Sequence, residues 1–182
     1  MYRQLSPIYT AQEVGGLVAS IARSMEADYG QAARGGTQGP VLLIGALKGA
    51  HVFMADLVRA VQFDVEVDFV QTASYGRRDR PSTEVLITRD ITSSIEGRDV
   101  VIVEGIVDRG HTAMALVDYL SSKGPGSLRF CSLLVRAGVE REVKVDYFGA
   151  VVGPGFVVGY GMDFKERFRG LDGIYTYKEE AT

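Results

Sequence analysis

One strand–turn–helix segment holds the residues best suited to chemistry. An apolar run at residues 100–103 leads into Glu104, and Asp108 then opens a short turn that contains Gly110. Glycine lets a backbone approach a ligand closely, and unpaired amides at a helix start attract anions. Three further polar residues are donors for such an anion: Arg109, His111 and Thr112. The segment therefore predicts an anion site.

The residue types around the turn narrow its chemistry. Thr112 is placed to cap a helix and to offer its hydroxyl to a ligand. Glu104 suits ribose hydroxyls or a water on Mg²⁺, because Mg²⁺ prefers oxygen ligands and keeps several waters. Pattern alone leaves an alternative open, in which the segment is an ordinary strand–loop–helix corner with a glycine in its turn.

This segment resembles the phosphoribosyl pyrophosphate (PRPP) motif of type I phosphoribosyltransferases, where apolar residues and two acids precede Asp-Thr-Gly-x-Thr. Three other segments narrow the resemblance to the hypoxanthine-guanine phosphoribosyltransferases. Residues 47–50 (LKGA) are similar to the pyrophosphate loop, and residues 74–76 (SYG) to the pair that opens the lid. Residues 156–163, with Arg169 soon after, are similar to the purine and metal segment.

The resemblance implies roles for the residues of the turn. Asp108 would lie beside N7 of the purine as general acid/base. The turn from Arg109 through Gly110 and His111 to Thr112 would hold the 5′-phosphate. Glu104 would face the ribose hydroxyls and contribute to a Mg²⁺ site.

The resemblance also implies groups that bind pyrophosphate and purine. Phe156 would stack on the base, the Val157 backbone would read its edge, and Arg136 would donate to the 6-oxo group. Asp163 would lie in the purine segment and bind a second Mg²⁺. Pyrophosphate would be bound by residues of three segments, the first of which has a cis Leu47–Lys48 peptide in many relatives: Lys48, Gly49, Ser74, Tyr75 and Arg169.

Three positions depart from the family's pattern. Gly105 stands where a second acid is expected, so one ribose or metal-water contact is missing. Arg109 replaces a threonine and brings a planar guanidinium that matches phosphate oxygens. We expect weakened PRPP binding from these two changes. Arg136 replaces the lysine that contacts the 6-oxo group, and its donors keep 6-oxopurines favoured over adenine.

The elements that position these residues alternate along the chain. The pattern predicts helices over residues 10–29, with Thr10 and Glu13 as a capping box, around 52–61 and over about 112–121. It predicts strands over 41–44, 65–69, 84–88, 100–103, 128–135, 145–152 and 156–160. Such alternation favours a mostly parallel sheet with ligands at the carboxyl ends of its strands.

The resemblance implies the type I phosphoribosyltransferase fold, an α/β fold whose mostly parallel central sheet is flanked by helices. We expect residues 1–182 to form a single phosphoribosyltransferase domain. Its core would span about 41–150. A small purine-binding hood would come from the N-terminal segment and about 151–182.

Composition excludes several classes of protein. The 182 residues include 20 Lys and Arg against 23 Asp and Glu, so no general nucleic-acid-binding surface is implied. Cys131 is the only cysteine, and the two histidines, His51 and His111, are far apart in sequence, which argues against disulfides and structural zinc. No apolar run approaches the roughly 18 residues of a membrane helix. We expect a cytoplasmic homodimer or homotetramer.

The sequence thus predicts a purine-salvage enzyme that needs Mg²⁺. It would transfer 5-phosphoribose from PRPP to N9 of guanine or hypoxanthine, giving GMP or IMP and pyrophosphate. A non-catalytic PRPP- or nucleotide-binding regulator of the same fold is the alternative that Gly105 and Arg109 support. A dinucleotide-dependent oxidoreductase is disfavoured, because no strand leads into Gly-x-Gly-x-x-Gly.

Overall fold

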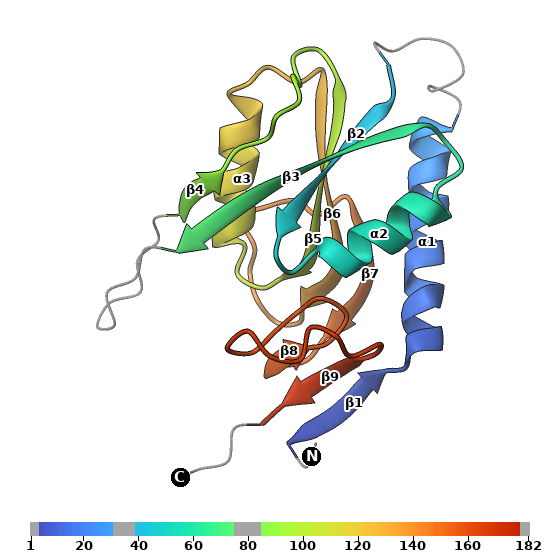
Figure 1. The fold of residues 1–182 in the computed structure, drawn as a ribbon, viewed down its shortest axis with the longest axis vertical. Helices are drawn as coiled ribbons and strands as arrows, with labels where there is room; N and C mark the ends of the chain where they lie inside the picture. Colours follow the sequence, from blue (N-terminus) through green and yellow to red (C-terminus); the bar gives the residue numbers. More distant parts are fainter. Residues whose placement is uncertain (1–3, 31–38, 75–84, 179–182) are drawn as a thin grey trace.

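A six-stranded, mostly parallel sheet forms the centre of the protein. The computed structural model describes residues 4–30, 39–74 and 85–178. The strand order is β4-β3-β2-β5-β6-β7, and within it only β4 runs antiparallel to its neighbour (Figure 1). The strands are β2 (Val41–Leu47), β3 (Val65–Ser74), β4 (Val85–Arg89), β5 (Asp99–Val107), β6 (Ser127–Arg136) and β7 (Tyr147–Val152). The predicted α/β class with a mostly parallel sheet is confirmed.

Three helices cover the two faces of this sheet. The side chains of α1 (Ala11–Tyr29) and α2 (His51–Ala60) pack in one hydrophobic cluster with Leu43, whereas α3 (His111–Ser121) packs in another with Leu42 and Ile44. These three β2 side chains are fully buried. A strand covered on both faces needs no polar alternation, which explains its unbroken apolar run. Among the described residues, no helix is long and apolar enough to cross a membrane.

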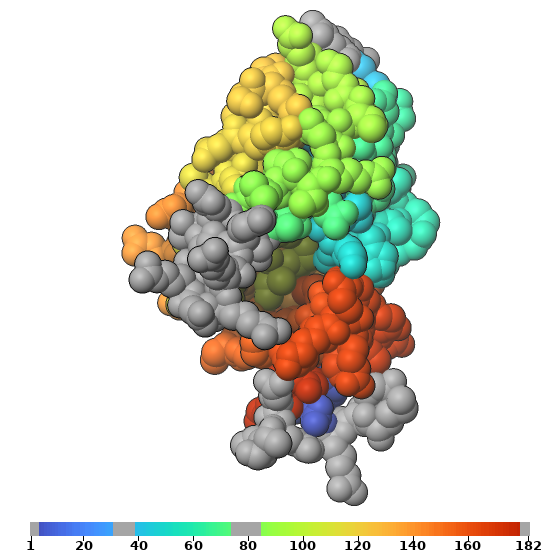
Figure 2. Space-filling model, turned by 60° about the vertical axis from the view of Figure 1, so that its left-hand side comes forward, coloured from blue at the N-terminus to red at the C-terminus, as the bar shows by residue number. Residues whose placement is uncertain are grey.

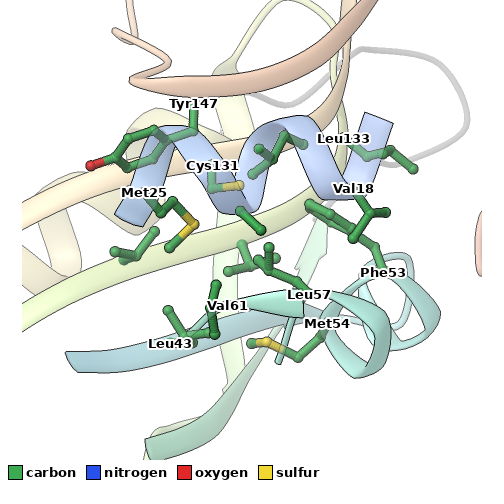
Figure 3. Packing of buried hydrophobic residues seen from close by; sticks show 14 of the residues in the cluster. Val18, Met25, Leu43, Phe53, Met54, Leu57, Val61, Cys131, Leu133 and Tyr147 are labelled. Atoms are coloured by element: carbon green, nitrogen blue, oxygen red, sulfur yellow. The ribbon is translucent and has the colours of Figure 1, made fainter. Parts of the chain in front are cut away.

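The helix α1 begins as its sequence predicts. The Thr10 hydroxyl accepts a hydrogen bond from the Glu13 amide, and the Glu13 carboxylate accepts from the Thr10 amide at 2.8 Å. Val18 and Met25 of α1 face Phe53 and other side chains of α2 and the sheet (Figure 3). Truncating one such buried side chain to alanine typically costs about 2–5 kcal/mol, so this packing anchors both helices to the sheet.

A second, three-stranded antiparallel sheet joins the two ends of the chain. Its order is β1-β9-β8, with β1 at Leu5–Tyr9, β8 at Phe156–Val158 and β9 at Ile174–Tyr177. In Figure 1 it lies below the central sheet. Figure 2 shows a recess between its C-terminal segments, in red, and the body of the large sheet.

Several predicted element boundaries need correction. The sequence patterns missed β1 and β9, which pair with each other across about 170 residues of the chain. The strand predicted over 156–160 ends at Val158, because Gly159 and Tyr160 adopt left-handed φ values of 97° and 50°. Helix α2 ends at Ala60, and Val61, predicted to be helical, is the extended C-cap residue, although its side chain is buried.

Glu104 is an ionisable side chain in the interior strand β5. It lies opposite the buried Ser132 in the β5–β6 pairing. Burial raises the pKa of the Glu104 carboxyl from 4.5 to about 7. The folded protein therefore holds this proton at pH values where the unfolded chain releases it.

We predict that Glu104→Gln removes a pH-dependent loss of stability. In the wild type, the free energy of unfolding should fall as pH rises from 4.5 to about 7, by up to about 3 kcal/mol, because only the unfolded chain ionises this group in that window. Urea titrations at pH 4.5, 6 and 7.5 measure the difference between the two proteins. A difference that stays constant over this range would contradict the prediction.

Candidate active site

The turn between β5 and α3 has the geometry that favours an anion. Gly110 has a left-handed φ of 92° and is the N-cap of α3, with no side-chain cap. The first helical hydrogen bond runs from the Met114 amide to the Gly110 carbonyl, which leaves the preceding amides without helical partners. A cleft of about 320 Å³ lies over them. All the residues predicted for the 5′-phosphate and ribose line it: Glu104, Asp108, Arg109, Gly110, His111 and Thr112.

One detail of the predicted turn is wrong. Thr112 is not the helix cap, because α3 already begins at His111 and Gly110 occupies the cap position. A glycine there places no oxygen over the helix amides. Those amides therefore remain available to a ligand, which strengthens the case for an anion site.

Asp108 and Arg136 form an ion pair at the neighbouring cleft. Arg136 Nε donates to Asp108 Oδ2 at 3.3 Å, and its Nη1 donates to the Gly153 carbonyl. The Arg136 side chain is 10% exposed and that of Asp108 is 58% exposed. The guanidinium is thus held by the fold, whereas the carboxylate faces the clefts on both sides.

The second cleft, of about 400 Å³, has an aromatic wall. Its lining includes Asp108, Arg109, Arg136 and Phe156. The Phe156 side chain is 59% exposed and contacts Phe164 edge-on, with 5.0 Å between ring centroids. An apolar segment such as 156–160 also allows Phe156 to be a core residue, but this exposure shows that it is not one. Its free face suits a flat ring.

Val157 is placed differently from Phe156. Its side chain is buried, and its backbone belongs to β8, the edge strand of the small sheet. Among the described residues no further strand lies on the other side of β8. Val157 thus lies at a sheet edge, the kind of position from which a backbone can contact the edge of a base.

The Lys48 turn packs against two other glycine-containing segments. The Leu47–Lys48 peptide is cis, as the resemblance implies. A Cβ atom on Gly105 would lie 3.1 Å from the Gly49 carbonyl oxygen, and one on Gly161 would lie 2.7 Å from it. The turn can approach β5 and residues 159–162 this closely only because both positions lack a side chain.

Four charged side chains gather beside this turn. Lys48 Nζ and Arg169 Nη2 both donate to Glu166 Oε2, each at 3.1 Å. Arg169 Nη2 also pairs with Asp163 Oδ1 at 2.8 Å, and its Nη1 donates to the Gly161 carbonyl at 2.8 Å. The hydrogen bonds from Lys48 and Arg169 hold the pKa of Glu166 below its usual value. Lys48 and Arg169, both predicted to bind pyrophosphate, are therefore brought together with Asp163, predicted to bind purine and metal.

The Asp163 and Glu104 carboxylates suit a metal ion that takes most of its oxygen ligands from substrate and water. Among the described residues, no three His, Cys, Asp or Glu side chains converge as a metal cage. Asp163, on the loop after β8, is paired with Arg169, and Glu104 lies in β5. Mg²⁺ is commonly held by one or two carboxylates plus substrate phosphates and waters, so this donor set is compatible with it.

Some predicted site residues fall outside the part of the chain that the structure describes, and the sequence analysis missed one residue of the charged cluster. Tyr75 and the rest of the predicted lid fall outside the described residues, as does the Ser74 side chain. Sequence patterns did not single out Glu166. Its spacing of three from both Asp163 and Arg169 was the available signal, since a tight turn brings such positions together.

Comparisons with known proteins agree with this geometry. The family model of the phosphoribosyl transferase domain matches residues 10–165 of this chain. The chain is 37% identical over 178 residues to the hypoxanthine-guanine phosphoribosyltransferase of Dictyostelium discoideum, covering 96% of each chain. It is 39% identical over 172 residues to that of Mycobacterium avium, covering 94% of this chain and 84% of the relative.

Two further matches are to part of a longer bifunctional protein and to a solved structure. The bifunctional protein TilS/HprT of Listeria monocytogenes is 44% identical over 140 residues, and the match spans 22% of that longer protein and 76% of this chain. A structure of Trypanosoma cruzi hypoxanthine phosphoribosyl transferase, studied for the role of its C-terminal region in oligomeric state and activity, superposes with a TM-score of 0.89. The two sequences are 31% identical, and the superposition covers 98% of this chain and 94% of that one. The chain belongs to the phosphoribosyltransferase family, among the hypoxanthine-guanine phosphoribosyltransferases.

Proposed function

We propose that this protein transfers 5-phosphoribose from PRPP to N9 of guanine or hypoxanthine and releases pyrophosphate. The observation that carries the proposal is the adjacency of two clefts that share Asp108 and Arg109. One cleft opens on the uncapped amides of α3, and the other on the exposed ring of Phe156. A phosphorylated sugar and a flat base bound in these clefts would meet at the Asp108 carboxylate.

In this proposal Asp108 holds or accepts the N7 proton of the base as N9 bonds to the ribose. The uncapped amides with Arg109, His111 and Thr112 bind the 5′-phosphate. Glu104 accepts hydrogen bonds from the ribose hydroxyls. The small sheet, with Phe156 and the Val157 backbone, acts as a hood over the base.

The pyrophosphate subsite in this proposal is the Lys48 turn with Arg169. Gly49 supplies backbone and the two cations offset the charge of the leaving group. Asp163 and Glu104 would hold Mg²⁺, which supplies additional positive charge to the pyrophosphate when bound. The roles of Ser74 and Tyr75 in this subsite stay predictions.

Arg136 supports 6-oxopurines as the bases. Its guanidinium lies at the second cleft and can only donate hydrogen bonds, so it favours an acceptor such as a 6-oxo group over the 6-amino group of adenine. Xanthine shares that acceptor, and its use is decided by assay.

The experiment that tests the function is an assay of purified protein with PRPP, Mg²⁺ and one of guanine, hypoxanthine, xanthine or adenine. We expect GMP or IMP and stoichiometric pyrophosphate with guanine or hypoxanthine, and little product with adenine. Omission of Mg²⁺ should abolish turnover. Failure to form product with any base, together with retained nucleotide binding, would favour the regulator instead.

We also propose that the chain self-associates as a homodimer or homotetramer, as the sequence analysis expects. Exposed hydrophobic side chains on the edge strand β7, Phe148 at 50% and Val151 at 54%, support this proposal. Sedimentation velocity at several protein concentrations distinguishes a monomer from either assembly.

We predict that Asp108→Asn lowers kcat at least about 100-fold and changes the Kd for GMP less than about fivefold. The amide keeps the shape and still accepts from Arg136, but it exchanges protons poorly with N7. Asp118→Asn, on an exposed position of α3, is the matched control and should leave kcat unchanged. An unaltered kcat in Asp108→Asn would rule out the proposed role.

The exposed Arg109 in the wall of the first cleft changes the expectation that this residue weakens phosphate binding. We predict instead that Arg109→Thr weakens binding of GMP about tenfold and leaves binding of guanosine nearly unchanged. Arg109 is exposed and has no ion pair within the described part of the chain, so its guanidinium is available to phosphate oxygens. Arg23→Thr, an exposed position on α1, controls for the loss of one positive charge. Equal weakening of GMP and guanosine would place Arg109 at the base rather than at the phosphate.

A further inference from the structure

Glu166 occupies the position that an anion would take between Lys48 and Arg169. One of its carboxylate oxygens, Oε2, accepts hydrogen bonds from both cations at 3.1 Å. With Asp163 also paired to Arg169, the cluster contains two cations and two carboxylates and has no net charge. Without a ligand, the two cations proposed to bind pyrophosphate are thus already neutralised by the protein itself.

The backbone enforces this placement of Glu166. Three non-glycine residues of the loop, Lys165, Glu166 and Phe168, have left-handed φ values of 51°, 62° and 75°. Such conformations are costly for residues with a Cβ and persist only where surrounding structure holds them. Phe164 stacks on Tyr177 at 4.5 Å, and the loop is closed by paired hydrogen bonds between residues 164 and 167. The fold therefore presents Glu166 to the cations.

Arg169 does not need Glu166 to keep its orientation. Its Nη1 donates to the Gly161 carbonyl at 2.8 Å, and its Nη2 contacts Asp163 at 2.8 Å. The Arg169 side chain is 20% exposed, whereas that of Glu166 is 65% exposed. When a ligand arrives, Glu166 can turn into solvent while the guanidinium stays in place.

We propose that Glu166 is an internal competitor for the pyrophosphate subsite, whose carboxylate must leave Lys48 and Arg169 before pyrophosphate or the pyrophosphate group of PRPP can bind. This inference rests on the proposed function for the identity of the subsite. It makes Glu166 a determinant of affinity for substrate and product and assigns it no part in the chemical step. A carboxylate left beside bound pyrophosphate would be repelled by the like charge, so binding and displacement are coupled.

The test is Glu166→Gln, which removes the charge and keeps the side-chain length and the backbone. We expect the Kd for magnesium pyrophosphate, measured by calorimetry, to fall about fivefold, as loss of two exposed ion pairs implies. The KM for PRPP should fall similarly, while the KM for guanine and the thermal midpoint stay unchanged. Glu96→Gln, an exposed glutamate just before β5, controls for overall charge and should change none of these values.

The outcomes separate this inference from the proposed function. A higher Kd in Glu166→Gln would mean that Glu166 orients the cations, and an unchanged Kd would mean that it does not compete; either overturns the inference while wild-type turnover stands. Tighter pyrophosphate binding by the variant, with no product from the wild type, would overturn the function alone. The double variant Lys48→Met/Glu166→Gln completes a double-mutant cycle. In the Lys48→Met background, Glu166→Gln should lower the Kd for magnesium pyrophosphate by a smaller factor than it does in the wild type.

Discussion

Close approach of three backbone segments at the Gly49 carbonyl sets the geometry on which the rest of the site depends. The Lys48 turn, the end of β5 and residues 159–162 meet there, and side chains at Gly105 or Gly161 would crowd that oxygen. Each segment carries a different part of the site: Lys48, Glu104 and Asp163. Their relative positions therefore follow from two missing Cβ atoms together with the packing of the two sheets.

The same constraint gives a physical account of one departure from the family pattern. A Cβ at position 105 would lie 3.1 Å from the Gly49 oxygen and 3.2 Å from Met162 Cγ. In this chain, a second acid would require the Lys48 turn or the Met162 side chain to shift by a few tenths of an ångström. Glycine at position 105 removes one side-chain contact to a ligand, but it preserves the packing of the three segments that carry Lys48, Glu104 and Asp163. No described contact explains the choice of Arg109, which lies at the mouth of both clefts.

Local signals predicted most of the large sheet, and non-local contacts explain the misses. The apolar run of β2 and the Thr10–Glu13 box need only neighbouring residues to be interpreted, and both were predicted correctly. β1 and β9 are short and pair across nearly the whole chain, so neither contains enough local pattern to be recognised. Residue types singled out Asp108, and the resemblance to the phosphoribosyltransferases singled out Lys48 and Arg169. Neither could reveal that Arg136 pairs with Asp108 or that Glu166 pairs with Lys48, because these two pairings span 28 and 118 residues.

These pairings share one electrostatic principle. Asp108 is paired with Arg136, Lys48 with Glu166, and Arg169 with Asp163. Glu104, which has no such partner within the described structure, is shifted by burial towards its neutral form. The charged side chains of the proposed site thus nearly balance one another, although the proposed substrate is highly charged. Binding then exchanges ion pairs instead of creating them. The net gain per contact is small for such an exchange, since each new attraction replaces an existing one. In this proposal, net affinity therefore comes chiefly from groups that have no ion-pair partner among the described residues: the helix amides after Gly110, the guanidinium of Arg109 and the free face of Phe156.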